Sequence, residues 1–218
     1  MQLKIRCSQL EHIRQNPLAY AQLLGANGEI TGGGTHGMFA CWQDSVKEVH
    51  RGIKTVSQAK NDLVKKYALR FEHTNSNTAK QERLLKAFEP HCIEFSKLKL
   101  DFEYSKKLIR WSLHSNVMLT GNTPWITKND KGYHIILPVQ EDILNWRDEL
   151  RFPLIQQYVG QHLFNIDVKT VKVGLYCLDN NAFDLQCYTP KQINEAITEA
   201  KYLFTIVNNE YLKVRAGL

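Results

Sequence analysis

The sequence lacks the features that would place it in a membrane, a secreted scaffold or a metal-cluster protein. Across its 218 residues, no apolar run approaches the ~18–20 residues that span a bilayer. The opening stretch MQLKIRCSQLEHIRQNP is charged and polar, without the apolar segment of a signal peptide. The five cysteines are scattered without a CxxC pair, so we expect neither a zinc site nor an iron–sulfur cluster. These absences predict a cytoplasmic protein with reduced thiols and no membrane association.

Two common enzyme motifs are also missing. The glycine triplet Gly32–Gly34 lacks the lysine of GxxxxGK[ST] and a preceding strand, so a phosphate-binding loop is not expected. There is no GxSxG sequence for a nucleophilic serine. The sequence contains no internal repeat, low-complexity segment or linker, and we expect residues 1–218 to form a single domain.

What the sequence does contain is an ordinary hydrophobic content and an excess of positive charge. Hydrophobic residues make up 43%, enough for a core, and 28 Lys and Arg against 22 Asp and Glu give a net charge of +6. A pI of about 9.0 favours contact with polyanions, nucleic acid above all. Many soluble proteins of similar charge bind no polyanion, so the charge alone leaves this question open.

Local signals predict an α/β fold in which helices flank a mixed central sheet. Turn chemistry at Asn129–Gly132 joins two β-rich runs, and the capping sequence Thr189–Gln192 begins the last helix. We expect sheet strands within 95–111, 117–127, 133–139 and 170–177, with a further strand at 183–188. We expect helices at 8–24, 36–50, 56–71, 79–88 and 190–211, and a largely helical segment at 141–164 that Pro153 divides.

The order of several short motifs adds a resemblance to a known family. A strand-like start and a helix occupy Ile5–Tyr20, and Gly34-Thr35-His36 stands at the head of a helix. Further on, Gly121–Ile126 begins a strand pair, and Leu154–Tyr158 lies on a helix before the strand at 170–177. This order resembles the RecB-like nucleases of the PD-(D/E)XK superfamily, which include CRISPR-associated and recombination exonucleases. The resemblance covers most of the chain and implies a restriction-endonuclease-like fold.

The resemblance also implies a reaction, metal-assisted phosphodiester hydrolysis. That reaction requires carboxylates to hold Mg²⁺ or Mn²⁺ and a lysine to act on the attacking water. Of the family's motif residues, His36 and Tyr158 are present, but Pro124 occupies the Asp position, Leu137 the Asp/Glu position and Val139 the Lys position. We therefore expect no catalytic residues, no metal and no cofactor.

A relocated active site is the alternative. Asp101 and Glu103 are two residues apart on an expected strand and so share a face, and Glu141 and Asp142 follow the second strand of the pair. Together with His36 these residues could hold Mg²⁺ or Mn²⁺ in an active DNA or RNA nuclease. The competing interpretation is that all four acids are surface carboxylates and that His36 is a hydrogen-bonded structural residue.

Basic residues crowd the segment before the strand pair, and they could form either a solvated face or an edge that contacts nucleic acid. These residues are Lys97, Lys99, Lys106, Lys107 and Arg110. The leading hypothesis is a non-catalytic nuclease-fold subunit that binds DNA, RNA or a protein partner. The resemblance places such a subunit in a prokaryotic DNA-processing or defence assembly. A purely structural partner whose basic face is incidental remains a third hypothesis.

Overall fold

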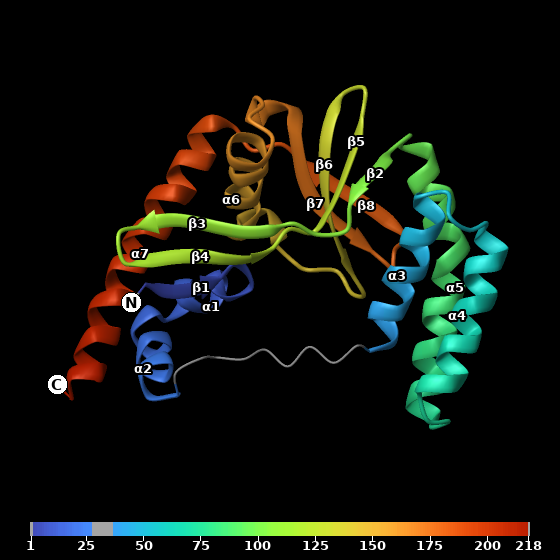
Figure 1. Cartoon of the computed structure of the whole chain (residues 1–218), viewed down its shortest axis with the longest axis horizontal. Coiled ribbons are helices and arrows are strands. Elements are labelled where there is room, and N and C mark those ends of the chain that lie inside the picture. The colour runs from blue at the N-terminus through green and yellow to red at the C-terminus, as the bar shows by residue number, and fades with distance from the viewer. Residues whose placement is uncertain (1, 28–36, 218) are drawn as a thin grey trace.

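A computed structural model describes residues 2–27 and 37–217, and it is an α/β structure with helices flanking mixed sheets (Figure 1). The α/β class is confirmed, but the expectation of one central sheet is wrong. The described strands form a three-stranded sheet in the order β1-β4-β3 and a five-stranded sheet in the order β2-β5-β6-β7-β8. The strands are β1 (Leu3–Arg6), β2 (Asp101–Tyr104), β3 (Leu108–His114), β4 (Val117–Asn122), β5 (Trp125–Asn129), β6 (Gly132–Val139), β7 (Val171–Cys177) and β8 (Ala182–Gln186).

The helices lie in two groups around these sheets (Figure 1). Helices α3, α4 and α5 lie together at one end of the molecule, and α2 and α7 lie side by side at the other. The helices are α1 (Leu10–Gln15), α2 (Pro17–Asn27), α3 (Met38–His50), α4 (Val56–Arg70), α5 (Asn75–Lys97), α6 (Arg151–Gln157) and α7 (Pro190–Ala216).

One long bent hairpin links the two sheets. Its outgoing arm is β2 followed by β3, and its returning arm is β4 followed by β5. At the bend, the Lys107 N–H donates to Thr123 Oγ1 and the Thr123 N–H donates to the Lys107 carbonyl, both at 2.8 Å. Pro124 follows directly, where the strand leaves one sheet for the other. A proline has no N–H for a strand ladder, so this corner is a position that tolerates it.

The five-stranded sheet confirms the expected strand pair. Strands β5 and β6 are antiparallel across the predicted turn, and β6 then pairs in parallel with β7, which confirms the strand expected at 170–177. Gly132, in this turn, has φ +130, and a Cβ there would lie 2.1 Å from the Thr170 carbonyl oxygen. Glycine is therefore required at this position. Strand β8 pairs antiparallel with β7, as expected for 183–188.

Two cores lie on opposite faces of the five-stranded sheet. The first core is rich in aromatic residues and joins α3–α5 to one face, with Trp42, Phe88 and Tyr176 fully buried. The second joins α6, α7 and the N-terminal helices to the other face and to the inner face of the three-stranded sheet. Among the described residues, helices thus cover both faces of the five-stranded sheet and one face of the three-stranded sheet.

Helix α5 corrects two expectations. It continues through Pro90 to Lys97, although a helix ending near Pro90 and a strand beginning near residue 95 were expected. A proline inside a helix costs about 3 kcal/mol or more. The buried stripe Leu84, Phe88, Cys92, Phe95 continues across Pro90 at helical spacing, and this burial outweighs the local penalty.

The N-terminal segment is two helices, where a single helix over 8–24 was expected. The side chain of Gln9 accepts the Arg6 N–H at 3.1 Å, and a short helical turn, Cys7–Gln9, precedes α1. Asn16 then accepts the Ala19 N–H at 3.0 Å and begins α2, with Pro17 as its first residue. This second cap separates α2 from α1.

The segment 141–164 is less helical than expected. Helix α6 begins only at Arg151, and Pro153 lies in its first turn, where the missing N–H costs no hydrogen bond. A π-helical turn, Tyr158–Leu163, follows directly. The predicted capping box at Thr189 does form and begins α7.

Candidate functional site

The positions that the resemblance would assign to catalysis lie at one end of the β5–β6 hairpin. Trp125 pairs with Ile136, so Pro124 and Leu137 are close to each other. Leu137 and Val139 are half-buried against the core beneath α6 and α7. Across residues 2–27 and 37–217, no group of three or more His, Cys, Asp or Glu side chains is placed to hold a metal ion. This end of the hairpin is a packing surface.

The structure does not bring the alternative ligands together. Asp101 pairs with Lys128 near the turn that joins β5 and β6, and Glu103 forms an ion pair with the same lysine. Glu141 and Asp142 follow the opposite end of β6, about 20 Å away at ~3.3 Å per residue. Glu141 there lies 3.6 Å from the Arg83 guanidinium. His36 lies outside the described residues.

Tyr158 closes the free edge of β3. Its hydroxyl donates to the Leu108 carbonyl at 3.1 Å and accepts the Arg110 N–H at 3.3 Å. Its ring stacks on His162, with centroids 5.7 Å apart. Tyr158 therefore fixes the strand that carries Arg110, and this role needs no chemistry at the hydroxyl.

The five basic residues singled out in the sequence do not share one face. Lys97 ends α5 and pairs with Glu94 at 2.5 Å, while Lys99 lies in the turn before β2. Lys106 and Lys107 lie at the bend of the long hairpin, and the Lys107 ammonium sits 3.8 Å above the ring of Tyr104. Of the five, Arg110 alone projects from a strand of the three-stranded sheet.

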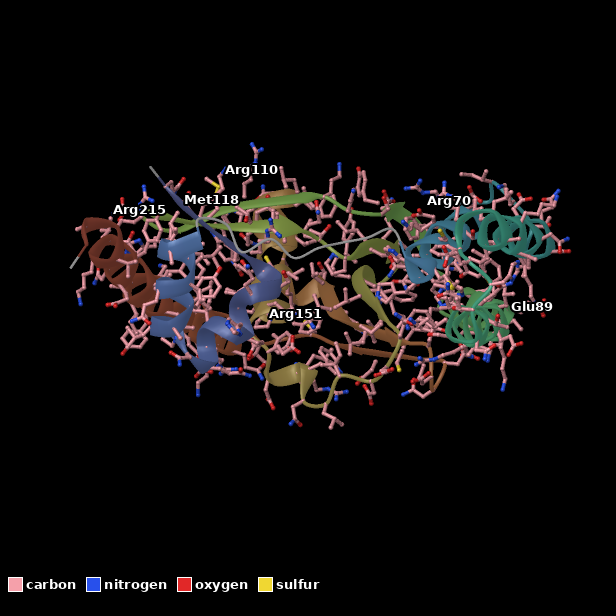
Figure 2. All side chains as sticks on the ribbon, turned by 90° about the horizontal axis from the view of Figure 1, so that it is seen from below. Arg70, Glu89, Arg110, Met118, Arg151 and Arg215 are labelled. Atoms are coloured by element: carbon pink, nitrogen blue, oxygen red, sulfur yellow. The ribbon has the colours of Figure 1, made fainter. Side chains whose placement is uncertain are left out.

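Arg110 instead belongs to a basic face that the sequence did not reveal. Arg6 on β1 and Arg110 on β3 both pair with Thr120 on the central strand β4, so these three side chains form one row. Lys4 and Met118 form the next row. Figure 2 shows Arg110 and Met118 projecting from the same side of the strands. We call this outer surface the basic face, and it consists of Lys4, Arg6, Leu108, Arg110, Met118 and Thr120.

A cavity of about 450 Å³ adjoins the basic face. Its remaining walls come from Gln9, Ile109 and, on α2, Tyr20 and Leu24. The Tyr20 hydroxyl donates to Gln9 Oε1 at 2.9 Å. Burial raises the pKa of Tyr20 to about 12, although the Arg6 guanidinium acts in the opposite direction, so the phenol stays neutral and adds no negative charge.

The basic face carries three cationic side chains. In the part of the chain that the structure describes, Lys4, Arg6 and Arg110 form no ion pair with a carboxylate. Lys4 and Arg110 are exposed, and Arg6 is half-buried. Three cations grouped on one surface create a positive potential that attracts anions.

The sequence signal for this face was the alternation in Leu3-Lys4-Ile5-Arg6. Leu3 and Ile5 are buried and their neighbours point outward, which is the pattern of a strand with one wet face. The partner strand β4 begins at Val117, far along the chain. A single sequence does not show that these two segments pair, and Arg6 and Arg110 meet only through that pairing.

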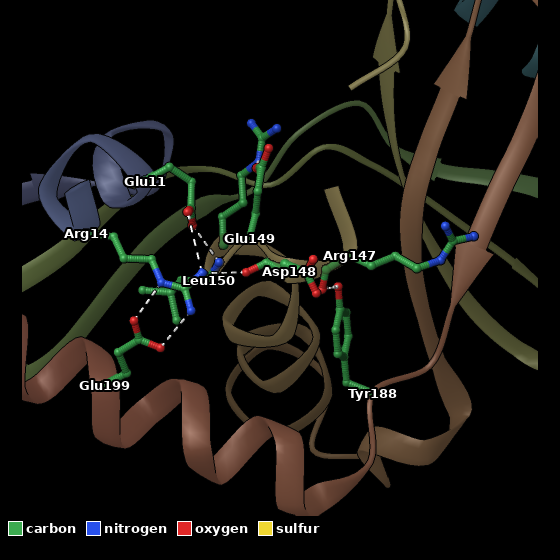
Figure 3. A network of polar contacts seen from close by, with 9 residues as sticks. Glu11, Arg14, Arg147, Asp148, Glu149, Leu150, Tyr188 and Glu199 are labelled. Carbon is green, nitrogen blue, oxygen red and sulfur yellow. Dashed lines mark hydrogen bonds and ion pairs between the residues drawn. The ribbon is translucent and has the colours of Figure 1, made fainter. Parts of the chain in front are cut away.

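A polar network behind the three-stranded sheet accounts for several carboxylates (Figure 3). The Arg14 guanidinium holds Glu199 through two contacts of 2.6 and 3.1 Å and also donates to the Asp148 carbonyl at 2.6 Å. Glu11 accepts the Leu150 N–H at 2.6 Å. Glu149 pairs with Arg151 at 2.5 Å, and burial raises the pKa of this carboxyl. These groups tie α1, α6 and α7 together.

Comparison with known proteins adds no family assignment. No family model matches the sequence, and no curated protein matches it significantly. Among the helices that the structure describes, none is both long and apolar enough to cross a membrane.

Proposed function

We propose that this protein is a non-catalytic subunit that binds nucleic acid through the basic face. The observation that carries the proposal is the row Arg6–Thr120–Arg110 with Lys4 beside it, three cations on one sheet surface. Phosphate contacts from Lys and Arg supply most of the sequence-independent affinity of proteins for nucleic acid. The expected ligand is therefore a DNA or RNA backbone.

The arrangement of the five-stranded sheet supports a nuclease-like ancestry for this subunit. Three antiparallel strands, β2, β5 and β6, are followed by a crossover through α6 to the parallel strand β7. This order is compatible with the restriction-endonuclease-like fold that the resemblance implies. The proposed setting, a prokaryotic DNA-processing or defence assembly with a protein partner, rests on that resemblance.

The side chains at the hairpin end favour binding without hydrolysis. Hard divalent cations such as Mg²⁺ are held by oxygen ligands, mainly carboxylates and waters. Pro124, Leu137 and Val139 offer no side-chain oxygen, and the space around Leu137 and Val139 is filled by apolar neighbours. The resemblance then implies a protein that holds a nucleic acid rather than one that cuts it.

The spacing of the cations suits the phosphates of one strand. Lys4 and Arg6 are two residues apart on β1, about 7 Å along the strand, and Arg6 and Arg110 are two strands apart, about 10 Å. Each phosphate neutralised on a single strand contributes about −0.7 to the slope of log K against log salt. Binding by the basic face is therefore expected to fall steeply as salt rises.

The test is a titration of labelled single- and double-stranded DNA and RNA at several salt concentrations. The double variant Arg6→Gln, Arg110→Gln should bind about tenfold more weakly and lose about 1.4 from the single-strand salt slope. The matched control, Lys65→Gln with Lys201→Gln, removes the same charge from exposed positions on α4 and α7 and should bind nearly as the parent does. Absence of binding at low salt by folded protein, or equal weakening by the control, contradicts the proposal.

Incubation of the same nucleic acids with Mg²⁺ or Mn²⁺ tests the non-catalytic part. We expect intact substrates. Cleavage that requires the metal and disappears in Asp101→Ala, Glu103→Ala would instead establish the relocated nuclease. These two acids pair with Lys128 or face water, so their removal leaves both cores intact.

A further inference from the structure

We propose that the cavity beside the basic face binds the phosphomonoester of a nucleotide, so that a nucleic-acid strand is held by a phosphorylated end. The inference rests on the proposed function and names the part of the ligand that the site selects. It concerns the cavity between the three-stranded sheet and α2, which is distinct from the β5–β6 hairpin end.

The size and enclosure of the cavity suit one nucleotide. A volume of about 450 Å³ lies within the range of ~300–1,000 Å³ that is typical of small-molecule sites. Tyr20 and Leu24 of α2 also line the cavity. In this proposal a strand crosses the open part of the basic face and places its terminal nucleotide in the cavity.

The charge of the cavity favours a terminal phosphate over an internal one. A phosphomonoester carries about −1.5 to −2 at pH 7, whereas an internal phosphodiester carries a single negative charge. Lys4, Arg6 and Arg110 reach the cavity from strands on both sides of β4. Guanidinium groups donate in pairs to phosphate oxygens, and this geometry suits an end with three free oxygens.

The hydroxyl groups in the cavity already donate within the protein. Thr120 Oγ1 donates to the Ile5 carbonyl at 3.1 Å, and the Tyr20 hydroxyl donates to Gln9. Recognition of an anion therefore depends on the three cations, which makes the site sensitive to their removal. Leu24, Leu108 and Met118 provide an apolar wall against which a base or sugar can pack.

The test compares oligonucleotides of one sequence, about eight nucleotides long, that differ only at their ends. One carries a 5′-phosphate, one a 3′-phosphate and one has hydroxyls at both ends. At fixed salt and pH 7, we expect one phosphorylated form to bind about tenfold more tightly than the hydroxyl form. Arg6→Gln should abolish this difference, Arg6→Lys should retain part of it, and the Lys65→Gln control should preserve it.

Competition with nucleoside monophosphates shows whether the phosphomonoester belongs to a free nucleotide or to the end of a nucleic-acid strand. Displacement of the phosphorylated oligonucleotide by a monophosphate shows that a free nucleotide also fills the cavity, whereas preference for the phosphorylated end without such displacement identifies a chain end as the ligand. Salt-dependent binding that ignores the terminal phosphate overturns this inference and leaves the proposed function standing. Binding of a monophosphate with no binding of any oligonucleotide supports the cavity and overturns the proposed function.

Discussion

The two sheets share one bent hairpin, yet they expose its strands to water in different ways. In the five-stranded sheet, Ile126, Ile135 and Ile136 are all buried because helices cover both faces. In the three-stranded sheet the described helices cover one face, and buried residues alternate with Lys4, Arg6 and other outward residues. A strand covered on both faces has few positions for a charged side chain. Recognition of a charged ligand is therefore expected at the smaller sheet.

The largest expected effect is a loss of stability in the core that covers the five-stranded sheet. Phe88→Ala removes a fully buried ring between α3–α5 and the five-stranded sheet, and should lower the free energy of unfolding by about 3–5 kcal/mol. Denaturant titration measures this change. Nucleic-acid binding by the remaining folded protein should not change, because the basic face lies on the other sheet. The control Leu69→Ala, at a residue 86% exposed, should cost less than about 0.5 kcal/mol.

The next effect is a pH dependence that arises in the same aromatic core. The Nε2 atoms of His50 and His91 lie 2.8 Å apart, and the His50 ring stacks on Phe95. Burial lowers the pKa of His50 to about 3 and that of His91 well below its usual value. Unfolded histidines gain protons below pH ~6.5 while the folded pair stays neutral. Stability is therefore full above pH ~6.5 and falls toward pH ~3, by up to about 1.4 kcal/mol per pH unit for each histidine.

Urea titrations at about pH 7, 6 and 5 measure how the free energy of unfolding changes with pH. The double variant His50→Phe, His91→Phe replaces both rings by apolar rings and should flatten the pH dependence. The exposed His73 provides a control, since His73→Gln should leave the slope unchanged. If the double variant loses stability with acid as steeply as the parent, the histidine pair is not the cause.

A smaller effect concerns the polar network behind the three-stranded sheet. Arg14→Ala removes the contacts to Glu199 and to the Asp148 carbonyl and should cost about 1 kcal/mol, the upper end for an exposed ion pair. Thermal or chemical unfolding measures the loss. Lys60→Ala, which breaks a single exposed pair with Glu89, should cost clearly less. Equal losses would show that the network adds nothing beyond an ordinary surface pair.

The smallest effect sharpens the boundary of the basic face. Lys106→Glu with Lys107→Glu places negative charge at the bend of the hairpin and should weaken nucleic-acid binding about threefold, less than the loss in Arg6→Gln, Arg110→Gln. These lysines lie outside the basic face, so we expect them to attract the nucleic acid only through their electrostatic field, which salt screens over about 8–10 Å. Titration at two salt concentrations checks this. A loss larger than that of the arginine pair would move the binding surface to the bend.

The elements that could be predicted from the sequence are those that local chemistry determines. The turn at Asn129–Gly132, the strand 171–177 and the capping box at Thr189 depend on residues within a few positions of one another. The end of α5 was missed because Pro90 is a local signal and the buried stripe that overrides it depends on tertiary packing. The division into two sheets follows from the bend at Thr123 and Pro124. The alternation of apolar and polar residues predicts strands but does not show where a strand passes from one sheet to another.

The candidate site was predicted less well, for a related reason. Arg110 was identified among basic residues that are neighbours in sequence, but its neighbours in space, Arg6 and Lys4, come from the N-terminal strand β1. Charge density along a sequence finds clusters on one segment. A face shared by three strands needs the strand order, and that order is a property of the whole fold.

The parallel pairing of β1 with β4 determines when, during synthesis of the chain, the basic face can form. Residues 3 and 117 must meet before Arg6 and Arg110 can lie in one row. At a synthesis rate of ~5–20 residues per second, the first strand waits many seconds on the ribosome for its partner. Until β3 and β4 have been made, Arg6 is not held beside Arg110. The surface that could retain a polyanion is therefore assembled only after β3 and β4 have been translated.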